Sequence, residues 1–286
     1  MFDIYTKHIA FYNFIGGGSL RKRVFILGPS HHVYLQECSL TSFDEWETPL
    51  GNLIVDKDMI NELVEKEEFV KMTNSEEEDE HSLEMQVPFL AHVFSSKLAD
   101  IKIVPIVVGN LSSSSEHRYG RVLSEYLANE ENFFIVSSDF CHWGSRFEYM
   151  AYSADPAPSS NLTFLNFRSA PNVIDPQVRL FQSITNLDHE AFDSIMTKSN
   201  TEFRKYLRAT KNTICGRHAI SVLLAATEIL ENKEPETLTN TVVATSSPSR
   251  PGNDGQYSIT FLDYTKSSNI TSIKDSSVSY AAGVLY

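Results

Sequence analysis

Three short runs of nearly continuous apolar residues stand out in the hydrophobic pattern of this chain. They cover residues 24–27, 101–108 and 133–136, and each is followed directly by Gly or Ser. Runs of this length, rich in Val, Ile and Phe, are typical of strands buried on both faces of a parallel sheet. We therefore expect a central sheet built on these three strands.

Apolar residues at helical spacing lie between and after these strands. We expect helices at residues 57–66, 82–94, 112–129 and 216–231, and two more within residues 177–207. Pro88 marks a boundary or kink, and Ser112 is a suitable N-cap. Strands that alternate with helices predict an α/β fold, in which a central, mostly parallel sheet has helices on both faces.

Two segments rich in Pro, Ser and Asn interrupt this pattern. Residues 154–176 and 246–255 are predicted to be surface insertions. The second of them separates two strand-like runs, 239–245 and 257–262. We expect these runs to pair as an antiparallel hairpin at one edge of a sheet.

The length of 286 residues, of which 42% are hydrophobic, suits one large α/β domain over residues 21–286. Residues 1–20 show no clear periodicity and contain three consecutive glycines. We treat them as a divergent or truncated N-terminus.

Charge and cysteine content exclude several classes of protein. The net charge of −13 argues against nucleic acid or an anionic membrane as the main partner. No apolar run reaches the roughly 18 residues that a membrane span needs, and none near Met1 resembles a signal peptide. Three cysteines are too few for a disulfide scaffold. We expect a cytoplasmic protein with free thiols, with the nucleus as a second location.

A pair of histidines follows the first strand. Gly28, Pro29 and Ser30 end the strand, so His31 and His32 lie at its carboxyl end, where open α/β sheets place their binding sites. Neighbouring side chains of an extended segment point to opposite sides, so one histidine is expected to enter a site. A structural pair is the alternative.

Two further polar groups lie at the ends of predicted elements. His81 and Glu84 are spaced to share one helix face, although a capped helix start is the simpler explanation. Asp139, Cys141 and His142 follow the third strand, where a carboxylate and an imidazole suit acid–base catalysis. Strand alternation would place Asp139 and Cys141 on one side and His142 on the other. The alternative is a turn in which Cys141 is simply packed.

Cys215 is the most informative thiol, because it lies at a predicted helix start with Arg217 and His218 close by. The helix start, Arg217 and His218 each favour the thiolate form of Cys215 over the thiol. One arrangement unites the candidates: a mononuclear metal site with His and Cys ligands, which suits zinc, copper or iron. The alternative is a Cys215 nucleophile with a histidine base and Asp139. Residue spacing does not separate the two.

Five motifs, taken in order, resemble the Memo family (mediator of ErbB2-driven cell motility). They are RVFILGPSHH, EDEHSLEMQVPFL, SSDFCHWG, NTICGRH and KDSSVSYAAG, and they extend over residues 21–283. The resemblance implies a fold like that of the class III extradiol dioxygenases, which are non-haem iron enzymes. It also implies a metal-binding pocket at the strand ends.

The resemblance implies a specific set of site residues. In the family, the metal ligands are a histidine of an early PHAGY motif, the first histidine of GPSHH and the cysteine of TICGRH. The last two correspond to His31 and Cys215, with Asp139 and His142 as neighbouring catalytic residues. The PHAGY motif is absent here and the context of His8 does not match it, so no third ligand is assigned. Other residues expected in or beside the pocket are His32, His81, Glu84, Cys141, Arg217 and His218.

Three functions follow from the resemblance. The leading hypothesis is a protein that binds one iron or copper ion and acts in redox chemistry or in signalling and cell motility. The second is a non-catalytic module that binds a protein or a phosphotyrosine peptide, with Arg217 and the histidines at the phosphate. The third, a functional extradiol dioxygenase, is disfavoured because the family has cysteine where the dioxygenases have a carboxylate ligand.

Overall fold

Three parallel strands form the centre of the fold. The computed structural model describes residues 22–66, 69–168, 170–231 and 257–286. In it, β1 (Arg23–Pro29) lies between β6 (Lys102–Val108) and β7 (Asn132–Val136), and both pairings are parallel. The three strands predicted from the apolar runs are confirmed.

The register of these strands brings their carboxyl ends to one edge. Pro29 lies opposite Val108, and Leu27 lies opposite Val136. The segments that follow the three strands therefore leave the sheet side by side. This edge is where open α/β sheets bind ligands.

Shorter strands widen the sheet and make it mixed. β4 (Leu53–Val55) runs parallel to β6 and pairs antiparallel with β3 (Glu45–Trp46). β2 (Cys38–Leu40) pairs antiparallel with the end of β6 and parallel with β5 (Phe69–Lys71). These strands of two or three residues are too short to produce a periodic signal, and the hydrophobic pattern did not predict them.

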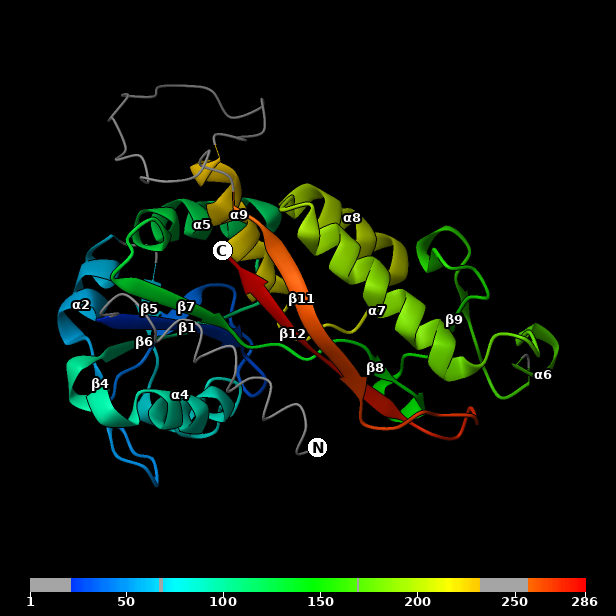
Figure 1. The fold of residues 1–286 in the computed structure, drawn as a ribbon, viewed down its shortest axis with the longest axis horizontal. Coiled ribbons are helices and arrows are strands. Elements are labelled where there is room, and N and C mark those ends of the chain that lie inside the picture. Colours follow the sequence, from blue (N-terminus) through cyan, green and yellow to red (C-terminus); the bar gives the residue numbers. More distant parts are fainter. Residues whose placement is uncertain (1–21, 67–68, 169, 232–256) are drawn as a thin grey trace.

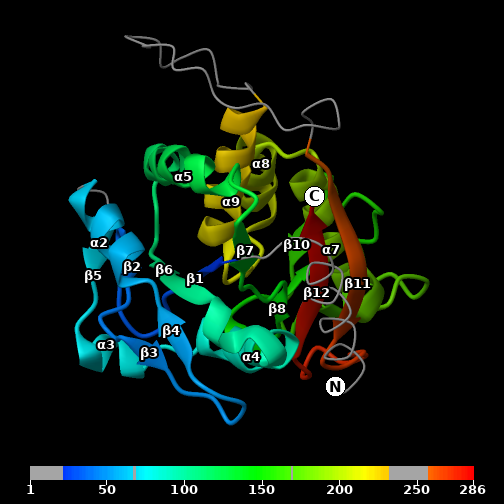
Figure 2. The ribbon, with the colours of Figure 1, turned by 60° about the vertical axis from the view of Figure 1, so that its left-hand side comes forward.

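Helices cover both faces of this sheet, as predicted. Figures 1 and 2 show α5 and α9 on one side and α4 on the other. The helices are α2 (Lys57–Glu65), α3 (Asn74–Glu78), α4 (Val87–Val93), α5 (Ser113–Leu127), α6 (Ala170–Val173), α7 (Leu180–Met196), α8 (Asn200–Thr210) and α9 (Arg217–Leu230). In the described part of the chain, four 3-10 turns accompany them: η1 (Glu84–Gln86), η2 (Ser95–Asp100), η3 (Ser145–Phe147) and η4 (Pro158–Ser160).

The helix expected over residues 82–94 begins later than predicted. Residues 84–86 form the 3-10 turn, and Pro88 lies in the first turn of α4. A proline is tolerated there because the first helical N–H groups have no partner within the helix.

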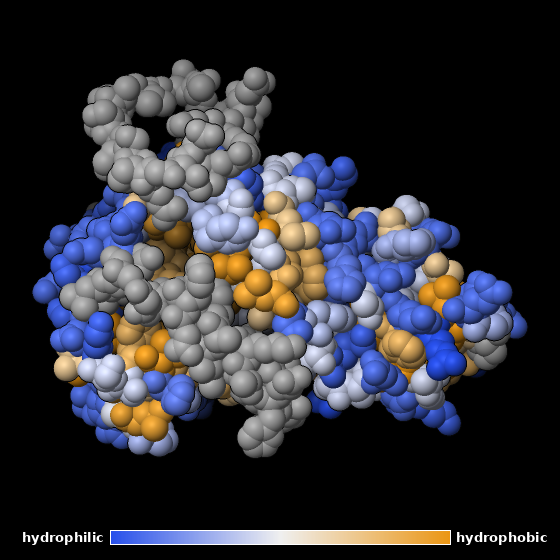
Figure 3. Space-filling view, viewed as in Figure 1, coloured by the Kyte–Doolittle hydropathy of each residue, from blue (hydrophilic) through white to orange (hydrophobic). Residues whose placement is uncertain are grey.

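A second hydrophobic cluster lies beside the sheet, around Trp143, Phe192 and Phe203. It is bordered by an antiparallel group of β8 (His142–Trp143), β12 (Ser277–Leu285) and β11 (Ile259–Lys266). Figure 3 shows apolar surface over β11 and β12 within a largely hydrophilic face, and Leu262 of β11 is 56% exposed.

The insertions and the predicted hairpin are described only in part. Residues 154–176 include η4, α6 and the short strand β10 (Thr163–Phe164), which pairs with β9 (Ala151–Tyr152). The strand predicted at 257–262 is found as β11, and its antiparallel partner is β12. Residues 239–245 and 246–255 lie outside the described residues. No helix in the described ranges is long and apolar enough to cross a membrane.

Asp56 connects the start of α2 to the sheet. Its carboxylate accepts a hydrogen bond from Met59 N–H at 3.3 Å and forms an ion pair with Arg23 at 2.7 Å. Lys102 lies 3.7 Å away. Burial alone would raise the pKa of Asp56, but these donors and positive charges outweigh it and lower the pKa.

We expect Asp56→Asn to lower the free energy of unfolding at pH 7 by about 1–3 kcal/mol, because it removes a hydrogen-bonded buried charge. A carboxylate with a lowered folded-state pKa stabilises the fold above its unfolded pKa, and this stability is lost as the pH falls through the folded value. The difference between wild type and variant in urea unfolding should therefore shrink below about pH 4. The matched control is Asp58→Asn, an exposed carboxyl of the same helical turn. An equal loss in both variants would contradict this account.

Candidate functional site

Side-chain hydrogen bonds fasten the segment around Ser82 to the ends of β1 and β7. Ser82 Oγ donates to Pro29 O at 2.7 Å, and Ser137 Oγ donates to Ser82 O at 2.8 Å. Gly28 allows this close approach, because a Cβ atom there would lie 2.7 Å from Leu83 Cδ2. The residues just before Ser82 are therefore brought next to His31.

His31 forms two hydrogen bonds with Glu80. Its Nδ1 lies 3.0 Å from Glu80 Oε1, and its backbone N–H donates to Oε2 at 2.6 Å. Hydrogen bonds to the Cys215 side chain and to Glu80 raise the pKa of His31 to about 10, although burial opposes the charged form. Burial alone would raise the pKa of Glu80, but the hydrogen bonds from His31 and from Ser82 N–H lower it to about 2. Glu80 is thus an ionised, nearly buried carboxylate.

The rings of His31, His81 and His32 pack in series. The ring of His81 stacks on that of His31 with 4.7 Å between centroids, and His32 meets His81 edge-on at 5.9 Å. Glu84 is exposed in the 3-10 turn η1. Glu80 rather than Glu84 faces the histidines, so the expectation that Glu84 lies in or beside the pocket is wrong.

Cys215 reaches the same region from the segment before α9. Its Sγ accepts a hydrogen bond from Asp139 N–H at 3.1 Å, and its side chain lies close enough to His31 to raise the pKa of that imidazole. Gly216 makes this approach possible, because a Cβ atom there would lie 2.5 Å from Ser137 O. His31 and Cys215 thus lie near each other in the fold, and their role as metal ligands stays a prediction.

Asp139 and His142 lie side by side at the edge of this group. His142 Nε2 is 3.7 Å from Asp139 Oδ2, and Nδ1 lies 2.9 Å from Thr213 O, where it can only donate. Burial raises the pKa of Asp139, and the charges of His142, His31 and His81 partly oppose that shift. The prediction that alternation separates Asp139 from His142 is wrong, because the chain leaves the strand after Val136.

Three residues expected in or beside the pocket have other roles. Cys141 is fully buried in the second hydrophobic cluster, and burial raises its pKa. The ring of His218 is held between Glu116 Oε1 at 2.7 Å and Asn110 Oδ1 at 2.8 Å. The guanidinium of Arg217 donates to the Ile214 carbonyl at 3.3 Å. Because α9 begins at Arg217, Cys215 lies outside the helix and shares no helix face with His218.

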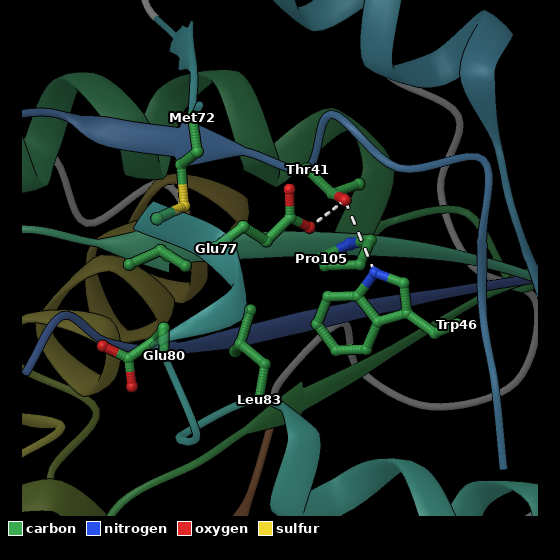
Figure 4. A pocket seen from close by; sticks show the side chains of 8 residues that line it. Thr41, Trp46, Met72, Glu77, Glu80, Leu83 and Pro105 are labelled. Atoms are coloured by element: carbon green, nitrogen blue, oxygen red, sulfur yellow. Dashed lines mark hydrogen bonds between the residues drawn. The ribbon is translucent and has the colours of Figure 1, made fainter. Parts of the chain in front are cut away.

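A small pocket adjoins Glu80 on the sheet side (Figure 4). Glu77 lies within it and accepts hydrogen bonds from the Thr41 hydroxyl and from Ser42 N–H. Trp46 Nε1 donates to the same Thr41 oxygen. These mutual contacts satisfy the polar groups, so the pocket is a packing feature rather than the centre of the site.

Residue spacing did not identify Glu80 or Thr213 as site residues. Glu80 is the last residue of the acidic run 76–80, which hides it among solvated carboxylates. Thr213 holds His142 twice: its Oγ1 accepts from His142 N–H at 2.8 Å and donates to His142 O at 3.0 Å. The one sequence feature that could have pointed to Thr213 is its position two residues before Cys215.

We expect Thr213→Val to destabilise the protein by about 1–3 kcal/mol, because it leaves the His142 N–H without its acceptor. Thr213→Ser keeps the hydroxyl and should lose much less stability. Urea unfolding at pH 7 measures both variants. If valine and serine have the same effect, the hydroxyl does not hold His142.

Comparison with known proteins identifies the family to which this chain is similar. Residues 9–284 match the family model described as Memo-like protein. The chain is 41% identical over 268 residues to Protein MEMO1 of Xenopus laevis and 38% identical over 267 residues to Protein MEMO1 of Homo sapiens. Each alignment covers 93% of this chain and 76% of the relative.

A solved structure supports the fold. The crystal structure of the uncharacterized protein JW3007 from Escherichia coli K12 superposes with a TM-score of 0.50 at 13% identity. The alignment covers 95% of this chain and 91% of that chain. At this identity the likeness concerns the fold alone.

Proposed function

The chain belongs to the Memo-like family, and on that basis we propose that it binds one redox-active metal ion, iron or copper, through His31 and Cys215. The proposal rests on one observation. The two side chains, which are far apart in the sequence, lie close together at the strand ends, where Cys215 raises the pKa of His31 and its Sγ accepts from Asp139 N–H. A role in redox chemistry or in signalling follows as part of the proposal, and a cytoplasmic or nuclear location stays a prediction.

The donor atoms suit such an ion. Imidazole with thiolate is a ligand combination that copper and iron accept. The Asp139 N–H that points at Cys215 Sγ stabilises negative charge on sulfur. A bound ion of this kind would supply one-electron chemistry.

Asp139 and His142 are the residues proposed to handle protons. Because Nδ1 donates to the Thr213 carbonyl, His142 directs its Nε2 toward Asp139 and the pocket. This nitrogen can accept and return a proton, and Asp139 helps to orient it.

Binding of a phosphotyrosine peptide is the second candidate. The observation in its favour is the exposure of His32 and His81 beside the pocket, with Arg217 directly after Cys215–Gly216. Imidazole N–H groups and a guanidinium can donate hydrogen bonds to phosphate oxygens. Titration of a phosphotyrosine peptide into metal-free protein tests it, since a binding module should not need the metal.

We expect Cys215→Ser to weaken Cu(I) binding by at least about tenfold, because Cu(I) prefers thiolate over oxygen ligands. Competition with a chromophoric Cu(I) chelator measures the affinity. Cys38→Ala is the control, because it removes a buried thiol in β2 that is not part of the site. Its affinity should stay within about twofold of wild type. Equal Cu(I) affinities for wild type and Cys215→Ser would rule out the thiolate site.

A further inference from the structure

His31, Glu80 and His81 form a compact group of metal-ligand types next to Cys215. One donor atom from each lies within 4.8 Å of the other two. No other group of three His, Cys, Asp or Glu side chains in the described ranges meets this condition. Neither family resemblance nor residue spacing pointed to Glu80 as a ligand.

We propose that these three residues bind a divalent first-row transition-metal ion through two imidazoles and one carboxylate, without Cys215. The site shares His31 with the proposed copper or iron site but does not depend on the thiolate. Two histidines and one carboxylate with open positions are the donor set of non-haem Fe(II) centres. Fe(II) is accordingly the ion we assign to it, with Co(II) as a spectroscopic substitute.

The donor atoms are already near the separations that one ion requires. Glu80 Oε1 lies 3.0 Å from His31 Nδ1 and 3.8 Å from His81 Nδ1. Ligand atoms about 2.0–2.2 Å from a common ion are about 3–3.5 Å apart. The His31 and His81 rings are stacked at an interplanar angle of 22°, so the exposed His81 ring must turn out of the stack to aim its nitrogen at the ion, which would replace the hydrogen bond between His31 and Glu80.

Glu80 is the fixed member of the group. Its side chain is 4% exposed, and its two oxygens accept from the backbone N–H groups of His31 and Ser82 at 2.6 and 2.9 Å. A buried carboxylate needs a positive partner, which His31 supplies in the metal-free protein and a bound cation would supply in its place. Each oxygen keeps a lone pair for the ion.

The histidines provide access from solvent. The side chains of His31 and His81 are 32% and 57% exposed, so an ion can reach the group without rearrangement of the fold. The bonds of Ser82 to Pro29 and Ser137 hold the backbone next to His81 in place. This rigidity reduces the entropy lost when the ion binds.

A more limited role for Glu80 makes a different prediction. Carboxylates often orient a metal-bound histidine from its other ring nitrogen. If Glu80 only orients His31 toward an ion shared with Cys215, then Cys215 is essential for binding and His81 is not. The two roles are therefore distinguished by variants of His81 and Cys215.

The test is Co(II) titration, followed by absorption spectroscopy and calorimetry, in the Cys215→Ser background. We expect this variant to bind one Co(II) with no sulfur-to-cobalt charge-transfer band. Adding His81→Ala or Glu80→Gln should weaken binding by at least about tenfold. The matched control is His32→Ala, the exposed histidine outside the group, with a change of no more than about twofold. Thermal unfolding without metal verifies that each variant folds.

Two results would overturn the proposal. One is complete loss of Co(II) binding in Cys215→Ser, and the other is an equal effect of His81→Ala and His32→Ala. Failure of the thiolate site gives a different pattern. In that case Cys215→Ser leaves the Cu(I) affinity unchanged, while His81→Ala still weakens Co(II) binding.

Discussion

The structure of the site depends on how the segment at Ser82 is fastened between two parallel strands. Ser82 bonds to the end of β1 through Pro29 O, and Ser137 at the end of β7 bonds to Ser82 O. These contacts lie where β1, β6 and β7 end in register. Because β1 and β6 are buried over almost their whole length, the position of this segment is set by the core rather than by solvent-exposed contacts.

Two kinds of donor meet at His31 as a result. On the side of the Ser82 segment lie Glu80 and His81, which offer oxygen and nitrogen. From the start of α9 comes Cys215, which offers sulfur and is held by Asp139 N–H. Oxygen and nitrogen favour Fe(II)-like ions, whereas sulfur favours softer ions such as Cu(I). The choice of metal therefore depends on which neighbours of His31 take part.

The hydrophobic pattern predicted the main strands and the long helices, because each carries a strong local signal. Side-chain partners were harder to predict where they depend on contacts between distant segments. His218 was expected beside Cys215, but buried Glu116 of α5 holds it elsewhere. Glu80 was hidden in an acidic run, and Asp139 faces His142 because the chain turns at the strand end. No local periodicity encodes such contacts.

The central claim is that His31 and Cys215 bind the same metal ion. X-ray absorption spectroscopy of the copper-loaded protein tests it most directly, because sulfur ligands lie farther from the metal than nitrogen ligands and scatter more strongly. The account predicts one sulfur ligand at about 2.3 Å together with imidazole nitrogen, and loss of the sulfur signal in Cys215→Ser. A spectrum with nitrogen and oxygen ligands only in the wild-type protein would contradict it.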